Sequence, residues 1–267
     1  MEKRPIGIFD SGVGGLTVFK EIRKKFPYED IVYFGDTARV PYGPKSKSTI
    51  KRYSMQNARF LIQQNAKIII IACNTASSVA VKYLQRNLKV PVMGVITPGA
   101  ECAVKKTVNK KVGIIGTEGT IRSEAYPKAI NELKNDIEVY SKACPLFVPI
   151  VEEGWENHPV TKLIIKEYLA ELKEKDLDTM VLGCTHYPIL KKQIQNYMGK
   201  HTNIIDSAVA VADKLQTILP NPQNSGKGKD KFFVSDNEAK FKAIAERIIE
   251  KRIRNLKVVR LGEVWYI

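Results

Sequence analysis

Runs of apolar residues alternate with amphipathic segments along most of the chain. The apolar runs predict ten short strands, at 5–9, 31–34, 67–72, 91–95, 111–116, 137–140, 179–183, 203–206, 231–235 and 257–261. Apolar residues at helical spacing predict helices between them, with the clearest faces at Leu16, Phe19, Ile22 and Phe26, at Ile165, Tyr168, Leu169 and Leu172, and at Phe241, Ile244, Ala245 and Ile248. The polar segment 221–230 predicts a surface loop. This alternation favours an α/β fold with mostly parallel sheets flanked by helices.

The two halves of the chain carry a weak internal repeat. The sequence IGIFDS at 6–11 aligns with VGIIGT at 112–117, with a glycine in second place and a hydroxyl residue, Ser11 or Thr117, in last place. Each copy leads to an apolar run that ends in a cysteine, 62 residues after Ser11 and 67 residues after Thr117. Chance similarity explains either stretch alone, but the matched cysteines favour two copies of one α/β unit.

Cys73 and Cys184 are these two cysteines, in IIIIACNTAS and TMVLGCTHYP. A single buried cysteine is usually a small apolar residue. Two cysteines at equivalent strand ends, each followed by polar residues, instead favour a functional site, because ligands of α/β sheets bind beyond the carboxyl ends of strands.

Helices are predicted to start just after both cysteines. Asn74 or Thr75 is a candidate N-cap for a helix through Leu84, and Thr185 for one through Leu190. The free N–H groups at a helix start stabilise a thiolate and lower the pKa of a cysteine below its usual value of about 8.5.

A carboxylate and an imidazole accompany the two thiols. Asp10 ends the first apolar run within FDSGVGG, a glycine-rich turn that lacks the lysine of a P-loop and a full GxGxxG, so a nucleotide site is a weak interpretation. At a strand end beside Cys73, Asp10 is suited to orient that thiol or relay its proton. His186 lies two residues after Cys184, where it is either a turn residue before Pro188 or a partner of the thiol.

Two thiols, one per half, indicate a substrate between them and inversion at a carbon that bears hydrogen. One thiolate removes the proton from one face and the other thiol delivers a proton to the opposite face. The two sulfurs are then expected about 6–8 Å apart, facing one pocket. Fixed donors must stabilise the charge that develops on the neighbouring carboxylate, and the candidates are Ser11, Asn74, Thr75 and Thr185.

Composition narrows the setting of this chemistry. The chain has 267 residues, of which 44% are hydrophobic and 27% charged, as in ordinary globular proteins. It has no apolar run of about 18 residues and no apolar N-terminal run long enough for a signal peptide, which predicts a cytoplasmic protein that spans no membrane. The four cysteines are then expected to be reduced, and the lack of a close CxxC pair argues against a metal site.

The net charge of +15 leaves three interpretations open. A basic, solvated surface is favoured, because the lysines are scattered among acidic residues. A nucleic-acid partner is less favoured, since no basic block interleaved with aromatic residues is present. A third interpretation is a positive field that steers an anionic small molecule inward.

Together the motifs resemble the glutamate racemases of the aspartate/glutamate racemase superfamily. The matching segments are IGIFDSGVGGLTV near the start, YFGDTARVPYG at 33–43, ACNTAS at 72–77, VPIVEEGW at 148–155 and LGCTHYP at 182–188. As a set they are highly specific, whereas ACNT or GCT alone indicates only the superfamily. The histidine after GCT resembles the glutamate branch, because aspartate racemases more often carry an acid there.

The resemblance implies two α/β domains, 1–97 plus 207–267 and 98–206, related by a pseudo-twofold axis with the active site in the cleft between them. It implies racemisation of glutamate without pyridoxal phosphate, metal or other cofactor, supplying D-glutamate for peptidoglycan. Family members are often dimers, so a homodimer is expected. Racemisation of aspartate or another acidic amino acid stays open, and hydrolysis by a Cys–His pair is disfavoured because it leaves the second cysteine unused.

The resemblance also assigns roles to residues of this chain. Cys73 acts on the D-enantiomer and Cys184 on the L-enantiomer, assisted by Asp10 and His186 respectively. The implied substrate-binding positions are Asp10, Ser11, Tyr42, Gly43, Asn74, Thr75, Thr117, Thr120, Thr185 and His186. Glu152 and Asp36 match acids near the family's site, with roles left open.

Overall fold

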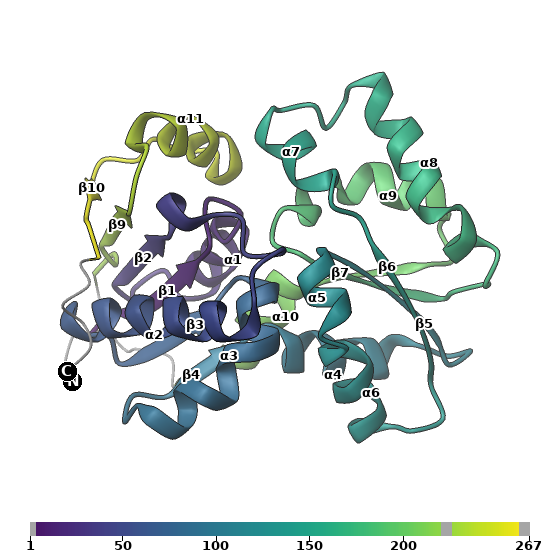
Figure 1. The fold of residues 1–267 in the computed structure, drawn as a ribbon, viewed down its shortest axis with the longest axis horizontal. Coiled ribbons are helices and arrows are strands. Elements are labelled where there is room, and N and C mark those ends of the chain that lie inside the picture. The colour runs from purple at the N-terminus through teal and green to yellow at the C-terminus, as the bar shows by residue number, and fades with distance from the viewer. Residues whose placement is uncertain (1–3, 220–225, 262–267) are drawn as a thin grey trace.

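Two parallel sheets organise the computed structural model, which describes residues 4–219 and 226–261 (Figure 1). One sheet has six strands in the order β10-β9-β2-β1-β3-β4, and the other has four in the order β6-β5-β7-β8. The strands are β1 Ile6–Asp10, β2 Ile31–Gly35, β3 Ile68–Ile71, β4 Val92–Gly94, β5 Lys111–Gly116, β6 Glu138–Ala143, β7 Thr179–Gly183, β8 Asn203–Asp206, β9 Asp230–Val234 and β10 Leu256–Val258. Each of the ten predicted strands overlaps one of these, and the predicted α/β class is confirmed.

Helices cover both faces of each sheet, as the continuous apolar strands require. The helices are α1 Leu16–Lys25, α2 Lys47–Gln63, α3 Asn74–Asn87, α4 Ile96–Lys106, α5 Glu118–Arg122, α6 Ala125–Leu133, α7 Phe147–Glu152, α8 Pro159–Lys173, α9 Lys191–Met198, α10 Ser207–Gln216 and α11 Glu238–Ile249, with short 3-10 turns η1 Thr37–Arg39 and η2 Tyr187–Leu190. Of the predicted loop 221–230, residues 221–225 lie outside the described residues, and Asp230 begins β9.

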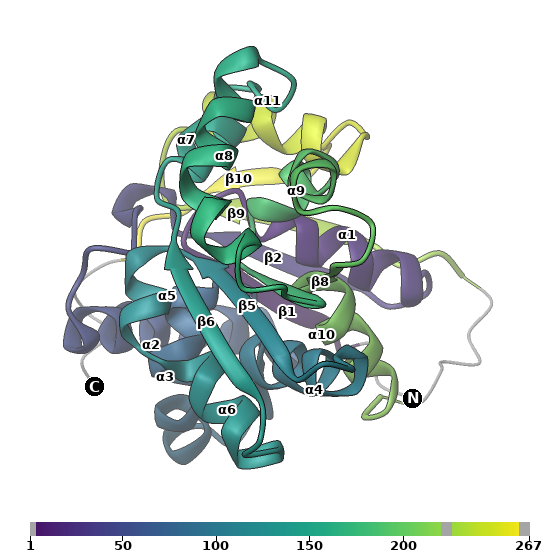
Figure 2. The ribbon, with the colours of Figure 1, turned by 90° about the vertical axis from the view of Figure 1, so that its right-hand side faces the viewer.

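Alternate residues of each strand point into different apolar cores. In the six-stranded sheet, Ile8 and Ile70 pack with α1, α10 and α11, whereas Phe9 and Ile71 pack with α2 and α3. In the four-stranded sheet, α7, α8 and α9 cover one face and α4 and α6 cover the other (Figure 2). We call the six-stranded sheet with its helices the first lobe, and the four-stranded sheet with its helices the second lobe.

The two lobes share one strand order. The order β2-β1-β3-β4 in the first sheet corresponds to β6-β5-β7-β8 in the second, and β9 and β10 extend the first sheet at one edge. The register agrees as well, because Ile6 pairs with Ile68 and the equivalent Val112 pairs with Thr179. The repeat seen in the sequence is therefore a repeat of topology, and it brings the two cysteine-bearing strands to equivalent places.

The matched glycines of the repeat have the same packing role. A Cβ at Gly7 would lie 2.9 Å from Ala66 Cβ, and one at Gly113 would lie 2.6 Å from Leu177 Cδ1. Ala66 and Leu177 each precede the cysteine-bearing strand of their lobe by two residues. Glycine suits both positions, because a side chain there would crowd the residue that leads into the neighbouring strand.

None of the helices in the described ranges is both long and apolar enough to cross a membrane.

Candidate active site

Cys73 is the N-cap of α3, two residues beyond the buried strand β3. Its sulfur accepts a hydrogen bond from the backbone N–H of Ala76 at 3.4 Å. The predicted helix is confirmed, but the prediction that Asn74 or Thr75 caps it was wrong. The helix begins at Asn74, because the preceding thiol already accepts one of the unpaired N–H groups of the first turn.

The thiol of Cys73 is not acidified in this site. Burial raises its pKa to about 12, and the nearby charge of Asp10 adds to this, while hydrogen bonds from Ser11 and from the N–H of Ala76 act in the opposite direction. The expected lowering by the helix start is present but is outweighed, because a thiolate here loses its hydration and faces a carboxylate. Ionisation of Cys184 also raises the pKa of Cys73, so the two thiols influence each other electrostatically.

Cys184, His186 and Glu152 form a second group, in the second lobe. The sulfur of buried Cys184 lies 3.8 Å from His186 Nδ1, and His186 Nε2 lies 3.3 Å from Glu152 Oε1. Thr185 does not cap a helix as predicted. His186 starts a 3-10 turn, Tyr187–Leu190, without a side-chain cap, and α9 follows only at Lys191.

The histidine of this group is held as a cation. Burial lowers the pKa of His186, but Cys184 and the Glu152 carboxylate outweigh burial and raise it to about 10. The same contact with His186 lowers the pKa of Glu152. Glu152 is therefore ionised at neutral pH and stabilises an imidazolium next to the second thiol.

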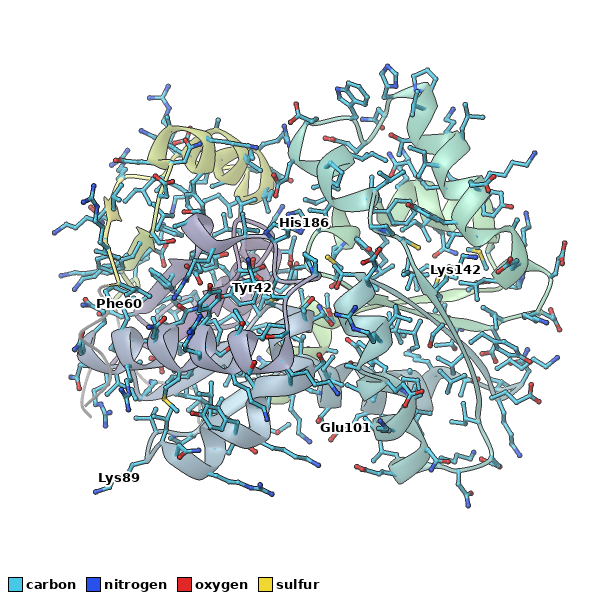
Figure 3. The ribbon with its side chains drawn as sticks, viewed as in Figure 1. Tyr42, Phe60, Lys89, Glu101, Lys142 and His186 are labelled. Atoms are coloured by element: carbon cyan, nitrogen blue, oxygen red, sulfur yellow. The ribbon has the colours of Figure 1, made fainter. Side chains whose placement is uncertain are left out.

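Asp10 links the two groups. Its Oδ2 accepts a hydrogen bond from Gly12 N at 2.9 Å, whereas its Oδ1 is buried with no hydrogen-bond partner among the described residues. Burial raises the pKa of Asp10, and the charge of His186 and nearby backbone N–H groups lower it. The loop after Asp10 also touches the second lobe, since a Cβ at Gly14 would lie 2.4 Å from His186 Nδ1. In Figure 3, His186 lies near the middle of the molecule, where the lobes meet.

Three threonine hydroxyls from the two lobes meet near the start of α3. Thr75 Oγ1 lies 2.8 Å from Thr117 Oγ1 and 3.3 Å from Thr120 Oγ1, and the last two are 3.1 Å apart. Beside them, Asn74 Oδ1 accepts a hydrogen bond from Tyr126 at 2.8 Å, which leaves the buried Asn74 Nδ2 without a partner in the described part of the chain. Asn74, Thr75, Thr117 and Thr120 were predicted for one site, and the structure brings the three hydroxyls together beside Asn74.

Tyr42 and Asp36 lie in a separate buried network. The Tyr42 hydroxyl donates to Asp36 and accepts from Asn57 at 3.1 Å, and Arg39 donates to both oxygens of Asp36 at 2.9 and 2.8 Å. Tyr42 is only 1% exposed, so its side chain is occupied in holding the 36–43 segment. The predicted substrate contact of Tyr42 and Gly43 then has to come from the backbone, and Gly43 is the residue that approaches Thr117 of the other lobe.

The sequence interpretation missed residues that orient the candidates. Thr17 donates to the carbonyl of Thr185 at 2.9 Å and so ties the glycine-rich loop to the Cys184 segment. Tyr126 fixes the amide of Asn74, and Arg39 neutralises buried Asp36. Thr17 lies inside the IGIFDSGVGGLTV motif, which could have indicated it, whereas Tyr126 stands in a segment with no recognisable signal.

Two further features bear on the site. Within residues 4–219 and 226–261, no three His, Cys, Asp or Glu side chains are grouped as a metal site requires. A cavity of about 490 Å³ lies between α3, α4 and α6, and neither Cys73 nor Cys184 is among its lining residues. The candidate chemistry is thus in the buried junction between the lobes and not in this cavity.

Known proteins are similar to this chain over almost its whole length. The family described as Asp/Glu/Hydantoin racemase matches residues 15–215. A glutamate racemase of Sulfurihydrogenibium sp. is 52% identical over 246 residues, which are 92% of this chain and 94% of that protein.

Two solved structures are similar in fold as well as in sequence. The glutamate racemase isoform RacE1 of Bacillus anthracis has a TM-score of 0.93 and 41% identity, covering 97% of this chain and 98% of that one. The glutamate racemase of Francisella tularensis, solved in complex with D-glutamate, has a TM-score of 0.91 and 40% identity, covering 98% and 99%. The chain therefore belongs to the glutamate racemases, within the Asp/Glu/hydantoin racemase family.

Proposed function

We propose that the protein is a glutamate racemase that interconverts L- and D-glutamate, with Cys73 and Cys184 as its two bases. One observation carries the proposal. Two buried cysteines stand beyond equivalent strands of two sheets with the same strand order, and ionisation of one raises the pKa of the other. These observations support the proposal because inversion at one carbon needs two acid/base groups, one for each face of the substrate.

The proposed reaction transfers two protons. A thiolate takes the α-proton from one face of glutamate, which leaves a carbanion and a neutral thiol. The opposite thiol then gives its proton to the other face and becomes a thiolate. Cys73 removes the proton from the D-enantiomer and Cys184 from the L-enantiomer, so the two directions use the same groups in opposite order.

Substrate charge is what activates Cys73 in this scheme. A thiol with a pKa of about 12 is almost entirely protonated at neutral pH. The substrate's ammonium group, bound beside Asp10 Oδ1, would offset both the carboxylate and the loss of hydration that disfavour the thiolate. Asp10 thus assists Cys73, as the paired His186 cation assists Cys184.

Donors around the thiols are suited to the two carboxylates of glutamate. The free Asn74 Nδ2 and the hydroxyls of Thr75 and Thr117 offer hydrogen bonds near the first cysteine. Ser11, which hydrogen-bonds to Cys73, and Thr185, next to Cys184, are further proposed donors. Preorganised donors of this kind stabilise the charge that develops when the α-proton leaves. Thr120 and the backbone at Tyr42 and Gly43 complete the proposed contacts.

The wider setting follows from the family. D-glutamate is a component of peptidoglycan, and we place the enzyme in its supply in the cytoplasm. We further propose two domains, 1–97 plus 207–267 and 98–206, and catalysis without a bound cofactor or metal. The packing of α10 on α1 supports the return of the chain to the first domain near residue 207. A homodimer is also proposed, on the resemblance alone.

The racemase proposal is tested with L-glutamate in D₂O, without added pyridoxal phosphate. We expect optical rotation to decay to zero while deuterium enters the α-carbon. Well-folded protein that does neither would refute it. The same assay with L-aspartate separates the substrates, because a faster reaction with aspartate would assign the enzyme to the neighbouring branch.

The two-base scheme has its own test. Cys73→Ala and Cys184→Ala should each abolish net racemisation, since one face of the substrate then lacks a proton carrier. Cys102→Ala is the matched control, because Cys102 lies outside the site on α4 and should leave the rate unchanged. Full activity in either site variant would disprove the assignment.

A further inference from the structure

Helix α11 belongs to the first lobe but also reaches the second. One face is buried in the first lobe's core through Phe241, Ile244, Ala245 and Ile248. Lys240 and Arg247 are seven residues apart and so project from one side of the helix. Figure 1 shows α11 opposite α7 at the top of the molecule, and both cations contact the end of α7.

Arg247 binds the backbone at the end of α7. Its Nη2 donates to the carbonyl of Val151 and, at 3.2 Å, to that of Glu152. The segment that follows is shaped around the guanidinium, because Gly154 has a φ of +73° and a Cβ there would lie 2.6 Å from Arg247 Nη1. The positive φ favours glycine at this position, and the missing Cβ leaves room for the guanidinium.

The residue that Arg247 holds is the one that contacts His186. Glu152 Oε1 lies 3.3 Å from His186 Nε2, and Glu152 Oε2 lies 3.6 Å from Lys240 Nζ. The other charged or titratable groups that face His186 are Cys184 and Asp10. A continuous set of contacts therefore runs from Arg247 through Glu152 and His186 to Cys184.

We propose that Arg247 is a positioning residue for the Cys184 half of the reaction, which fixes the end of α7 so that Glu152 stays against His186. The inference rests on the proposed function. It makes the protonation of His186 depend on α11 of the first lobe, so the second thiol has its full environment only when the two lobes are together. Arginine suits the role because its planar group serves two carbonyls at once.

The test compares the two directions of the reaction. If Cys184 serves the L-enantiomer, Arg247→Ala should slow only the proton transfers made by Cys184, by about tenfold to a hundredfold. The kinetic isotope effect on kcat/KM should then rise with α-deuterated L-glutamate and fall toward one with α-deuterated D-glutamate. Arg247→Lys should recover part of the rate, and Lys242→Ala, which changes an exposed lysine of the same helix, should behave like the wild type.

A second readout does not depend on turnover. The imidazole resonance of His186 should titrate about one pH unit lower in Arg247→Ala, because the Glu152 carboxylate is no longer held beside it. The chain has only three histidines, so His158→Gln and His201→Gln variants assign the signal. In a Glu152→Gln background, Arg247→Ala should cause little further change in rate or titration, since both substitutions weaken the same contact, that between residue 152 and His186.

The outcomes separate the two proposals. Wild-type protein with no exchange would sink the racemase itself. If the wild type is active, two results for Arg247→Ala would contradict the inference: isotope effects that change equally in both directions, or a His186 titration that does not move. Either would show that Arg247 makes a purely structural contact. Additive effects of Arg247→Ala and Glu152→Gln would likewise overturn the inference.

Discussion

At the scale of single residues, the two candidate thiols differ in the charge that each one faces. Cys73 is next to the carboxylate of Asp10, which raises its pKa, whereas Cys184 is next to the imidazole of His186. The sequence pattern predicted both neighbours. Asp10 lies at the end of the strand next to the one that leads to Cys73, and His186 lies two residues after Cys184. It did not predict that the pKa of Cys73 is raised, since burial outweighs the effect of the helix start. That burial depends on the closed junction between the lobes, which a sequence pattern does not show.

Buried His186 should make the stability of the fold depend on pH. Its pKa is about 10 in the folded protein, against 6.5 for an unperturbed histidine. Between these values only the folded state keeps the proton, so the free energy of unfolding falls as pH rises from about 6.5 to about 10 and is highest, for this group, below pH 6.5. We expect His186→Gln to flatten this slope in urea melts at several pH values.

Exposed His201 provides the control for this experiment. Folding raises the pKa of Cys73 from 9.0 to about 12, so this thiol lowers the free energy of unfolding with rising pH only above about pH 9. Melts between pH 6.5 and 8.5 therefore report the contribution of His186. His201→Gln should keep the wild-type slope. A slope that persists unchanged in His186→Gln would show that this imidazole is not held as a cation.

At the scale of elements, periodicity predicted every strand but not the local starts of the helices. Continuous apolar runs identify these strands because a strand of a parallel sheet is buried on both faces, so that nearly all of its residues are apolar. The N-cap of α3 was misplaced by one or two residues, since the thiol of Cys73, and not the amide of Asn74 or the hydroxyl of Thr75, caps it. The segment after Cys184 forms a 3-10 turn in place of the predicted helix, with Pro188 in its first turn. Caps depend on single hydrogen bonds, which sequence patterns do not resolve.

The segment 36–43 is an element held by its buried polar network, which gives a direct prediction. Tyr42→Phe removes the hydroxyl that donates to Asp36 and accepts from Asn57. We expect the free energy of unfolding to fall by about 1–3 kcal/mol, because a buried carboxylate loses a donor. Chemical denaturation measures this, with Tyr53→Phe on the neighbouring partly exposed tyrosine as the comparison. Equal stability of Tyr42→Phe and wild type would mean that Arg39 alone satisfies Asp36.

At the scale of the whole molecule, the internal repeat was the most informative feature of the sequence, because it predicted two similar halves with the cysteines in equivalent places. The spacing within each repeat, 62 residues in the first and 67 in the second, is the spacing of the paired residues Ile6 and Ile68 and of Val112 and Thr179. This is why the two cysteines could be assigned to equivalent strand ends from the sequence. Contacts between the lobes were beyond reach, because Tyr126–Asn74 and Arg247–Glu152 join segments with no common pattern. Packing of one lobe on the other, and not local sequence, selects these pairs.

The glycine-rich loop after β1 packs against the second lobe, so adding one methyl group there should disturb the site. A Cβ at Gly14 would lie 2.4 Å from His186 Nδ1 and 2.5 Å from Thr185 Oγ1, so one of these buried side chains or the loop itself would have to shift. We expect Gly14→Ala to lower kcat/KM by about a hundredfold in both directions, because both Cys184 and the loop that carries Asp10 move. Gly12→Ala, in the same loop, meets only Val40 Cγ2 at 3.4 Å and should cost far less. Racemisation kinetics beside thermal melts distinguish displacement from unfolding, and equal activity of the two alanine variants would show that the lobes are not packed this closely in solution.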